Sequence, residues 1–352
     1  MAYTNFNLGD DLFIKILSER YIDSKFILYV PKKYKKVFKE NKNIKIYSSD
    51  VFINRVINYL LRFLFKDTKE KRLKRKVDAI VHIGGSIFME NSNWKRRQLI
   101  RKNLFKKPYY VIGANFGPYK TDEFYQSYKS IFESYTDISF RDSYSYNLFK
   151  EMSNVRLADD VVFNLNPTIQ ETEKSIVISV IKPSYRKELV GKDNQYYLRI
   201  KELIEEYTNK KYQVTLMSFC KHEGDLEAIH SIKKLLSNKT KINYFSYEDN
   251  IEDALNIIAK SEMIIATRFH AMILGWVYNK PTLPIAYSAK MTNVMNDVGY
   301  NGMYIDFTNL EDLQFNKVYE DLKTNSVNIS KQIADSEKHF KKLDEFLEKN
   351  NY

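Results

Sequence analysis

The chain has 352 residues, of which 44% are hydrophobic, and 56 Lys and Arg against 44 Asp and Glu give a formal net charge of +12. This length and apolar content suffice for two domains with ordinary cores. The single cysteine, Cys220, excludes an intramolecular disulfide and fits a reducing compartment. No apolar run reaches the roughly 18 residues of a membrane span, and the first residues lack the pattern of a signal peptide. We therefore expect a cytoplasmic protein.

The positive charge is compatible with nucleic acid, a membrane surface or acidic substrates as partners. The sequence has no helix-turn-helix, zinc-finger or RNA-binding signature, and its lysines mostly alternate with glutamates along helical stretches. We therefore predict that nucleic acid is not a partner. No group of His, Cys, Asp or Glu has metal-ligand spacing and no Walker-type loop occurs, so we predict no required metal and no required cofactor.

Apolar, β-branched runs alternate with amphipathic helical patterns along the chain. The first half contains predicted strands at 25–30, 77–85, 109–115 and 137–142, and a predicted helix at 122–135. The second half contains predicted strands at 175–181, 212–219, 262–269 and 281–288, and predicted helices at 194–208, 225–238 and 251–261. Strands that alternate with helices predict an α/β protein with parallel sheets covered on both faces.

Residues 51–76, VFINRVINYLLRFLFKDTKEKRLKRK, are the most unusual stretch. On a helix, Asn54, Arg55, Asn58 and Arg62 form one polar stripe on an otherwise apolar surface, and a cluster of Lys and Arg follows. One interpretation is an interfacial helix on an anionic membrane, which would make the protein peripheral at the inner face of the cell membrane. The other is a helix buried between strands, with a solvated basic tail.

The polar segment 164–175, which contains Pro167, precedes the predicted strand at 175–181 and is the best candidate for a domain boundary. We therefore predict a first domain at 1–168 and a second domain at 169–328. The amphipathic stretch at 329–352 predicts a C-terminal helix that packs across the junction or on the first domain.

Ligands of open α/β sheets bind beyond the carboxyl ends of the strands. In the first domain this rule selects Gly84, Gly85, the loop at 113–117 and Arg141. In the second domain it selects the loop at 218–225, the Arg268–His270 segment and the end of the strand before Lys290.

Arg268 and His270 fall where a predicted strand meets a predicted helix. Backbone N–H groups at a helix start favour an anion, and a guanidinium suits a phosphate or a carboxylate. An imidazole at the same point can donate a hydrogen bond or move a proton. Lys290 ends the next strand, so we expect three groups around one small anion site. Taken singly, His270 could only cap the helix and Arg268 only pair with a carboxylate such as Glu262.

The segment IIATRFHAMILGWVYNKPTLPIAYSAK resembles the signature of the polysaccharide pyruvyl transferase family, with its Arg-x-His-Ala motif, Pro-containing strand and Tyr-Ser-x-Lys ending. Other segments resemble motifs of that family in the same order: NFNLGDD, HIGGSIF, IGANFGPY, SFRDSYS, LADDVVFNL and SFCKHEGD. The family usually has a full strand before its Asn-x-Gly-Asp opening, whereas only MAYT stands here. Either MAYTNF is a shortened strand or the natural start lies upstream.

The resemblance implies two Rossmann-like domains facing a cleft, as in glycosyltransferases of the two-domain (GT-B) type. It also implies transfer of pyruvate from phosphoenolpyruvate (PEP) to a sugar, as a ketal, in a cell-surface polysaccharide or its lipid-linked precursor. The implied PEP-binding residues are Arg141, Arg268, Phe269, His270 and Lys290, of which His270, Arg268 and Lys290 are the catalytic candidates.

The sugar acceptor is expected mainly on the first domain, and its candidate ligands are Asn5, Asp10, Gly84, Gly85, Asn115, His222 and Asp225. Two alternatives stay open: a nucleotide-sugar-dependent glycosyltransferase of similar fold, and a non-catalytic relative that binds an anion or a glycan.

Overall fold

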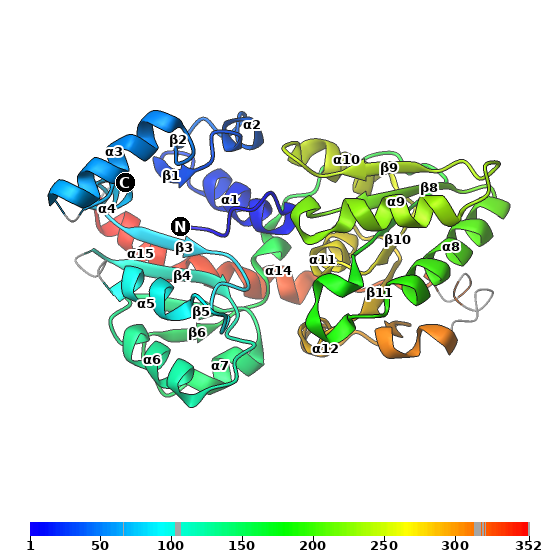
Figure 1. Cartoon of the computed structure of the whole chain (residues 1–352). Helices are drawn as coiled ribbons and strands as arrows, with labels where there is room; N and C mark the ends of the chain where they lie inside the picture. Colours follow the sequence, from blue (N-terminus) through cyan, green and yellow to red (C-terminus); the bar gives the residue numbers. More distant parts are fainter. Residues whose placement is uncertain (66, 103–106, 313–317, 319, 321, 351–352) are drawn as a thin grey trace. The chain divides into compact units, whose positions relative to one another are not determined.

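The computed structural model describes residues 1–65, 67–102, 107–312, 318, 320 and 322–350. The chain forms two compact units (Figure 1). The first unit consists of residues 1–4, 13–164 and 332–352, and the second consists of 5–12 and 165–331. The sequence placed the boundary at 168/169 and left residues 5–12 in the first domain. In the structure this short segment groups with the second unit instead.

The first unit contains two parallel sheets. Strands β1 (Phe26–Val30) and β2 (Ile44–Ser48) form one pair, and β3 (Ile80–Ile83), β4 (Tyr109–Ala114), β5 (Asp137–Phe140) and β6 (Val155–Leu157) form the other sheet in that order. Ala2 bridges to Ile83 in parallel orientation, and the Ile83 amide donates to the Met1 carbonyl at 2.9 Å. The first residues therefore lie beside β3, paired with it through a single bridge.

The helices of the first unit connect these strands. They are α2 (Tyr34–Val37), α3 (Phe52–Phe65), α4 (Lys69–Lys74), α5 (Trp94–Lys102), α6 (Asp122–Phe132) and α7 (Ser143–Phe149), with a 3₁₀ turn at Val161–Asn164. Helix α1 (Leu8–Arg20) begins in residues of the second unit and ends in residues of the first. Aromatic rings fill the core, with ring centres 4.8 Å apart for Phe116 and Phe149 and 4.9 Å apart for Phe88 and Phe132. Thr121 and Asp142 cap α6 and α7 by accepting a backbone N–H.

The second unit has one six-stranded parallel sheet in the order β9-β8-β7-β10-β11-β12. Its strands are β7 (Ser175–Ser179), β8 (Gln213–Ser218), β9 (Asn243–Ser246), β10 (Met263–Ala266), β11 (Thr282–Ala286) and β12 (Ile305–Asp306). Counted along the chain within this unit, the order is that of the dinucleotide-binding Rossmann fold. The order reverses between β7 and β10, and this point is where such sheets bind ligands.

The helices of the second unit are α8 (Asp193–Asn209), α9 (Asp225–Leu235), α10 (Ile251–Lys260), α11 (Phe269–Val277) and α12 (Ala289–Val298), with 3₁₀ turns at Pro183–Tyr185, Lys187–Leu189, Lys221–Glu223 and Phe307–Asp312. Every residue of α11 is buried. That burial explains why its sequence is apolar all round rather than on one stripe.

The C-terminal region is broken into α14 (Ser330–Ser336), a 3₁₀ turn (Glu337–Phe340) and α15 (Lys341–Lys349). The sequence predicted one continuous helix there. Residues 332–352 belong to the first unit, where Arg20 Nη2 pairs with Asp344 at 3.1 Å and the Ser139 hydroxyl bonds His339 Nδ1 at 2.6 Å. Of the two packing alternatives, these contacts correspond to packing on the first unit.

The eight strands predicted from sequence are all present, with ends trimmed by up to three residues. Within the described ranges, the prediction missed β2, β6, β9 and β12. β6 and β12 have only three and two residues, and β9 begins with two exposed residues, so neither an apolar run nor a clean alternation marks these three strands. β2 has five residues, as many as β1, and was missed in spite of its Ile-Lys-Ile alternation. No helix in the described part of the chain is both long and apolar enough to cross a bilayer.

Candidate active site

Arg268 lies directly after β10, at the point where the strand order of the second unit reverses. The backbone N–H groups of Thr267 and Arg268 each donate to the hydroxyl of Ser179, at 3.1 Å. Ser179 ends β7, the strand on the other side of the reversal. Helix α11 begins at Phe269, so the predicted strand–Arg–x–His–helix arrangement is confirmed as local structure.

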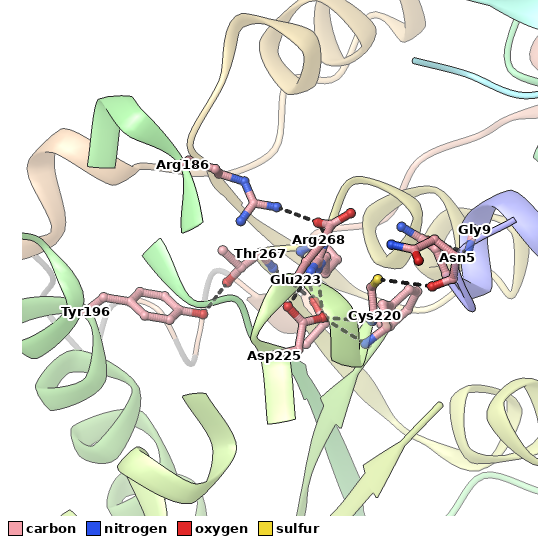
Figure 2. A network of polar contacts seen from close by, with 12 residues as sticks. Asn5, Gly9, Arg186, Tyr196, Cys220, Glu223, Asp225, Thr267 and Arg268 are labelled. Atoms are coloured by element: carbon pink, nitrogen blue, oxygen red, sulfur yellow. Dashed lines mark hydrogen bonds and ion pairs between the residues drawn. The ribbon is translucent and has the colours of Figure 1, made fainter. Parts of the chain in front are cut away.

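The Arg268 guanidinium is held by two carboxylates (Figure 2). Its Nε donates to Asp225 Oδ2 at 2.9 Å, Nη2 donates to Asp225 Oδ1, and Nη1 donates to Glu223. Burial alone would lower the pKa of Arg268, but the two carboxylates raise it well above its ordinary value. The guanidinium therefore stays charged, and its fork is occupied by protein carboxylates.

Asp225 is completely buried behind Arg268. Besides the guanidinium, its Oδ2 accepts the backbone N–H groups of Phe219 and Cys220, both at 3.0 Å. Both carboxylate oxygens thus have protein partners. We correct the sequence prediction of Asp225 as an acceptor ligand, because a carboxylate in this position holds Arg268 and the loop before α9. Glu262, the carboxylate suggested as a partner of Arg268, instead accepts the Tyr212 hydroxyl at 2.7 Å.

Glu223 joins Arg268 to a second arginine that the sequence analysis missed. Arg186 Nη2 lies 3.2 Å from Glu223 Oε2, and its guanidinium lies 4.5 Å from the centre of the Tyr287 ring. Burial opposes ionisation of Glu223, but Arg268, Arg186 and Lys290 outweigh burial and lower its pKa. Arg186 follows β7, so the rule of strand ends would have found it if applied to the loop after that strand.

His270, the second residue of α11, packs against the start of α1. A Cβ atom built on Gly9 would lie 1.7 Å from the imidazole Nδ1, so this contact requires glycine. Gly9 donates its N–H to Asn7 Oδ1 at 3.1 Å, and Leu8 donates its N–H to the Phe219 carbonyl at 3.0 Å. The Asn-Leu-Gly-Asp motif therefore shapes the surroundings of His270.

Asn5 and Asp10 were expected on the side of the first domain. Both belong to the 5–12 segment of the second unit, and the Asn5 carbonyl accepts the Cys220 thiol at 3.8 Å. His222 is exposed, with its ring centre 6.1 Å from that of Phe6. Together with Asp225, four of the seven predicted acceptor ligands are thus in the second unit.

Lys290 is the second residue of α12, after β11. Its ammonium lies 4.0 Å from the centre of the Phe269 ring, a cation–π distance, and its charge contributes to the lowered pKa of Glu223. Phe269 in turn lies with its ring centre 5.0 Å from that of His270. The structure therefore brings together the four PEP-binding candidates predicted in the second domain.

The fifth, Arg141, is in the first unit, after β5. Its side chain is 1% exposed, donates to Asp160 at 2.7 Å and to Asn115 Oδ1 at 2.9 Å. A Cβ atom on Gly85 would lie 2.2 Å from its Nη2. Gly85, Asn115 and Arg141 thus meet at the carboxyl ends of three neighbouring strands, while Gly84, with a φ of +142°, shapes the turn after β3. Direct contact of Arg141 with PEP stays a prediction.

Cys220 is not a nucleophile candidate, since burial raises the pKa of its thiol to about 12. Among the residues that the structure describes, no three His, Cys, Asp or Glu side chains are grouped as metal ligands.

A family model described as polysaccharide pyruvyl transferase matches residues 7–289. The amylovoran biosynthesis protein AmsJ of Erwinia amylovora is 22% identical over 286 residues, which cover 74% of this chain and 69% of that protein.

Solved structures of similar fold include the following two. Anabaena HepE, in complex with UDP and glucose, matches with a TM-score of 0.58 and 11% identity, covering 96% of this chain and 95% of that chain. The UDP-GlcNAc 2-epimerase of Neisseria meningitidis, bound to UDP-GlcNAc, matches with a TM-score of 0.56 and 12% identity, covering 92% of this chain and 100% of that chain. The predicted fold class, α/β with two Rossmann-like domains of the GT-B type, is confirmed.

Proposed function

Because this chain belongs to the polysaccharide pyruvyl transferase family, we propose that it transfers a pyruvyl group from PEP to hydroxyls of a sugar. The sugar is part of a cell-surface polysaccharide or its lipid-linked precursor, and the products are a pyruvate ketal and phosphate. The similarity to a protein named for amylovoran biosynthesis supports a polysaccharide acceptor. The observation that carries the proposal is the placement of His270 and Lys290 around Phe269, beside the buried Arg268.

This site suits a small anion. Arg186, Arg268 and Lys290 bring three positive charges, and Glu223 and Asp225 bring two negative ones, so the cluster keeps a positive excess. The start of α11 adds the positive end of its helix dipole. We assign direct contact with PEP to Lys290 and to the start of α11, while Arg268 contributes its charge from behind and fixes the loop that precedes α9.

The reaction needs proton transfer at two points. A proton must be added to the methylene carbon of PEP, which makes the neighbouring carbon electrophilic. A sugar hydroxyl then attacks that carbon and loses its proton, the C–O bond to phosphate breaks, and a second hydroxyl closes the ketal. Of the two hydroxyl protons, one restores the general acid and the other leaves with phosphate.

We assign the proton-donating role to His270, because an imidazole can give and accept a proton near neutral pH. Its position at the second residue of α11 places it beside the proposed anion site. Gly9 lets the ring pack directly against the start of α1, which limits how the ring can rotate. Lys290 is assigned to the phosphate, where its charge stabilises the leaving group.

The first test needs no acceptor. PEP at about a hundredfold excess over its dissociation constant should stabilise the folded protein by about 2.7 kcal/mol, which a thermal-unfolding assay detects. UDP-glucose and UDP-N-acetylglucosamine serve as comparison ligands. A shift with a UDP-sugar and none with PEP would identify a nucleotide-sugar glycosyltransferase instead.

The second test is turnover. The protein is incubated with PEP and candidate polysaccharides or lipid-linked oligosaccharides, and phosphate release is followed together with the methyl signal of the ketal in NMR spectra. Phosphate and ketal should appear in equal amounts. PEP binding without release of phosphate on any of these acceptors would favour the non-catalytic alternative.

A further inference from the structure

Two polar side chains of helix α3, Asn54 and Asn58, face the protein, while most of its apolar side chains face outward. Asn54 is buried, where its Nδ2 donates to the Ser48 carbonyl and its Oδ1 accepts Lys69 Nζ at 2.7 Å. One turn later, Asn58 donates to the Tyr29 hydroxyl at 2.6 Å and accepts the Lys69 N–H at 2.8 Å. Two residues of the polar stripe predicted from sequence thus anchor the helix to β1, to the end of β2 and to the start of α4.

The opposite surface of α3 is apolar and exposed. Eight large apolar side chains are 39% to 80% exposed, with Phe52 at 80%, Phe63 at 75% and Tyr59 at 70%. The full set is Phe52, Ile53, Val56, Ile57, Tyr59, Leu60, Phe63 and Leu64. The buried-helix interpretation is therefore wrong for these residues. An exposed apolar surface of this extent on a helix indicates a binding surface rather than scattered surface residues.

Basic residues accompany this surface. Residues 51–76 contain nine Lys and Arg against two Asp and Glu. Arg55 within α3, and Arg72, Arg75 and Lys76 in and after α4, are exposed. Asp67 pairs with Arg72 and Arg75, and Glu70 pairs with Lys74, so the two acidic residues offset only part of this charge. The region, which Figure 1 labels α3 and α4, combines exposed apolar side chains with a positive excess of charge.

We infer that α3 lies in the surface of an anionic lipid bilayer, with its apolar side chains inserted and the basic residues of α3 and α4 at the headgroups. Three aromatic residues, Phe52, Tyr59 and Phe63, are suited to this boundary region. The 14 residues of α3 span about 21 Å, less than the roughly 30 Å of a bilayer core, so the helix lies along the surface and does not cross it.

Charge favours lipid over a second copy of this chain as the occupant. Two copies that met through α3 would bring two strongly basic segments together, and their repulsion would weaken the dimer. An anionic lipid surface would instead attract the same charges and strengthen binding. A bilayer also accepts the whole apolar side of a single helix, whereas two packed helices cover only a stripe of each.

The test is sedimentation of the full-length protein with vesicles of phosphatidylcholine alone and of phosphatidylcholine mixed with phosphatidylglycerol. The wild type should bind the mixed vesicles at low salt and release as salt rises. Phe52→Ser combined with Phe63→Ser should weaken this binding at least about tenfold, since both side chains would lose their burial in lipid. Both residues are exposed, so the fold should be unaffected.

The matched control replaces two exposed isoleucines elsewhere, Ile22→Ser with Ile169→Ser, which are 73% and 93% exposed and should leave binding unchanged. The charge variant Arg55→Glu with Lys76→Glu should weaken binding by about fivefold or more per charge. Its control is Lys192→Glu with Lys331→Glu, at two exposed lysines of the second unit.

Two results would overturn the inference. One is that the wild type ignores mixed vesicles at low salt, or binds them as well after the phenylalanine substitutions as before. The other is a stable dimer in sedimentation velocity that the phenylalanine variant dissociates, without vesicle binding by either protein. That second result would make the occupant another copy of this chain.

Discussion

Gly9 and His270 lie so close that no other residue fits at position 9 without displacing the imidazole. This contact joins the Asn-Leu-Gly-Asp motif to the Arg-x-His motif, although 261 positions separate them in the chain. Neither motif alone indicates the contact. The glycine lets the imidazole pack directly against the start of α1.

The first prediction follows from this contact. Gly9→Ala should destabilise the protein by about 1–3 kcal/mol, because the new Cβ atom overlaps the ring. In a His270→Ala background the same substitution should cost much less, since the overlap is gone. Urea unfolding of the four proteins measures the coupling. An equal cost in both backgrounds would mean that the alanine clashes with something other than the imidazole.

The second prediction separates binding from proton transfer at His270. His270→Gln keeps hydrogen-bonding capacity but cannot exchange a proton, so PEP affinity should stay within a few-fold of wild type while turnover falls by roughly 10² or more. His230→Gln, at an exposed histidine of α9, is the control. Turnover close to wild type in His270→Gln would leave His270 as a helix cap or phosphate ligand, and Lys290 would become the candidate acid.

The third prediction concerns the buried ion pair. Arg268→Ala leaves the completely buried Asp225 without its counter-ion, and should cost about 3–5 kcal/mol of stability together with PEP binding. Adding Asp225→Asn should restore part of the stability, because an amide oxygen still accepts the two backbone N–H groups and carries no charge. Turnover should remain low in the double variant. If the single variant were as stable as wild type, the pair would not hold the loop as described.

The fourth prediction concerns Lys290. Lys290→Met keeps apolar contact with Phe269 but removes the charge, so the PEP dissociation constant should rise by about tenfold or more at unchanged thermal stability. Lys290→Arg should retain most of the affinity, and Lys331→Met is a surface control. Calorimetric titration with PEP gives the constants. Unchanged affinity in Lys290→Met would remove this residue from the proposed anion site.

The fifth prediction concerns pH. Burial lowers the pKa of His339 to about 3 from its ordinary 6.5. The neutral ring forms hydrogen bonds with the Ser139 hydroxyl and the Asp159 carbonyl. Between these two values the unfolded chain binds one proton more than the folded protein, so stability falls as pH falls below 6.5, by about 1.4 kcal/mol per pH unit.

The measurement for this prediction is urea unfolding of wild type and His339→Gln at several pH values between 7 and about 5. The glutamine variant should be less stable at neutral pH but should lose less stability on acidification. Parallel curves for the two proteins would show that His339 titrates equally in the folded and unfolded states.

Much of the fold could be predicted because buried parallel strands have a strong signature. β7, β10 and β11 are buried along their whole length and read as continuous apolar runs. β12 has two residues and β6 has three, which is too little sequence for any period to show. The C-terminal helix was predicted as continuous because its apolar spacing persists through the 3₁₀ turn at Glu337–Phe340.

The candidate site was predictable in position but not in its contacts. The strand-end rule located Arg268, His270 and Lys290 correctly beside one another. It could not show that Glu223 and Asp225 occupy the guanidinium, because the loop that carries them is contributed by a different strand. For α3, the sequence showed a polar stripe on an apolar helix but not which side faces outward. Its orientation depends on hydrogen bonds from Asn54 to Ser48 and from Asn58 to Tyr29, and the spacing of residues along the sequence does not predict these contacts.

Residues 332–352 belong to the first unit although they follow the second unit in the chain, and this affects the order in which the two units can fold during synthesis. Synthesis proceeds from the N-terminus, so the 5–12 segment and residues 165–331 are all made before the last piece of the first unit. Until then Ser139 and Arg156 lack their partners His339 and Lys338, and the first unit has an uncovered surface. The usual order, in which the N-terminal domain folds first, is therefore reversed. A shortened chain that ends at residue 331 and is released from the ribosome should contain a protease-resistant second unit and a protease-sensitive first unit.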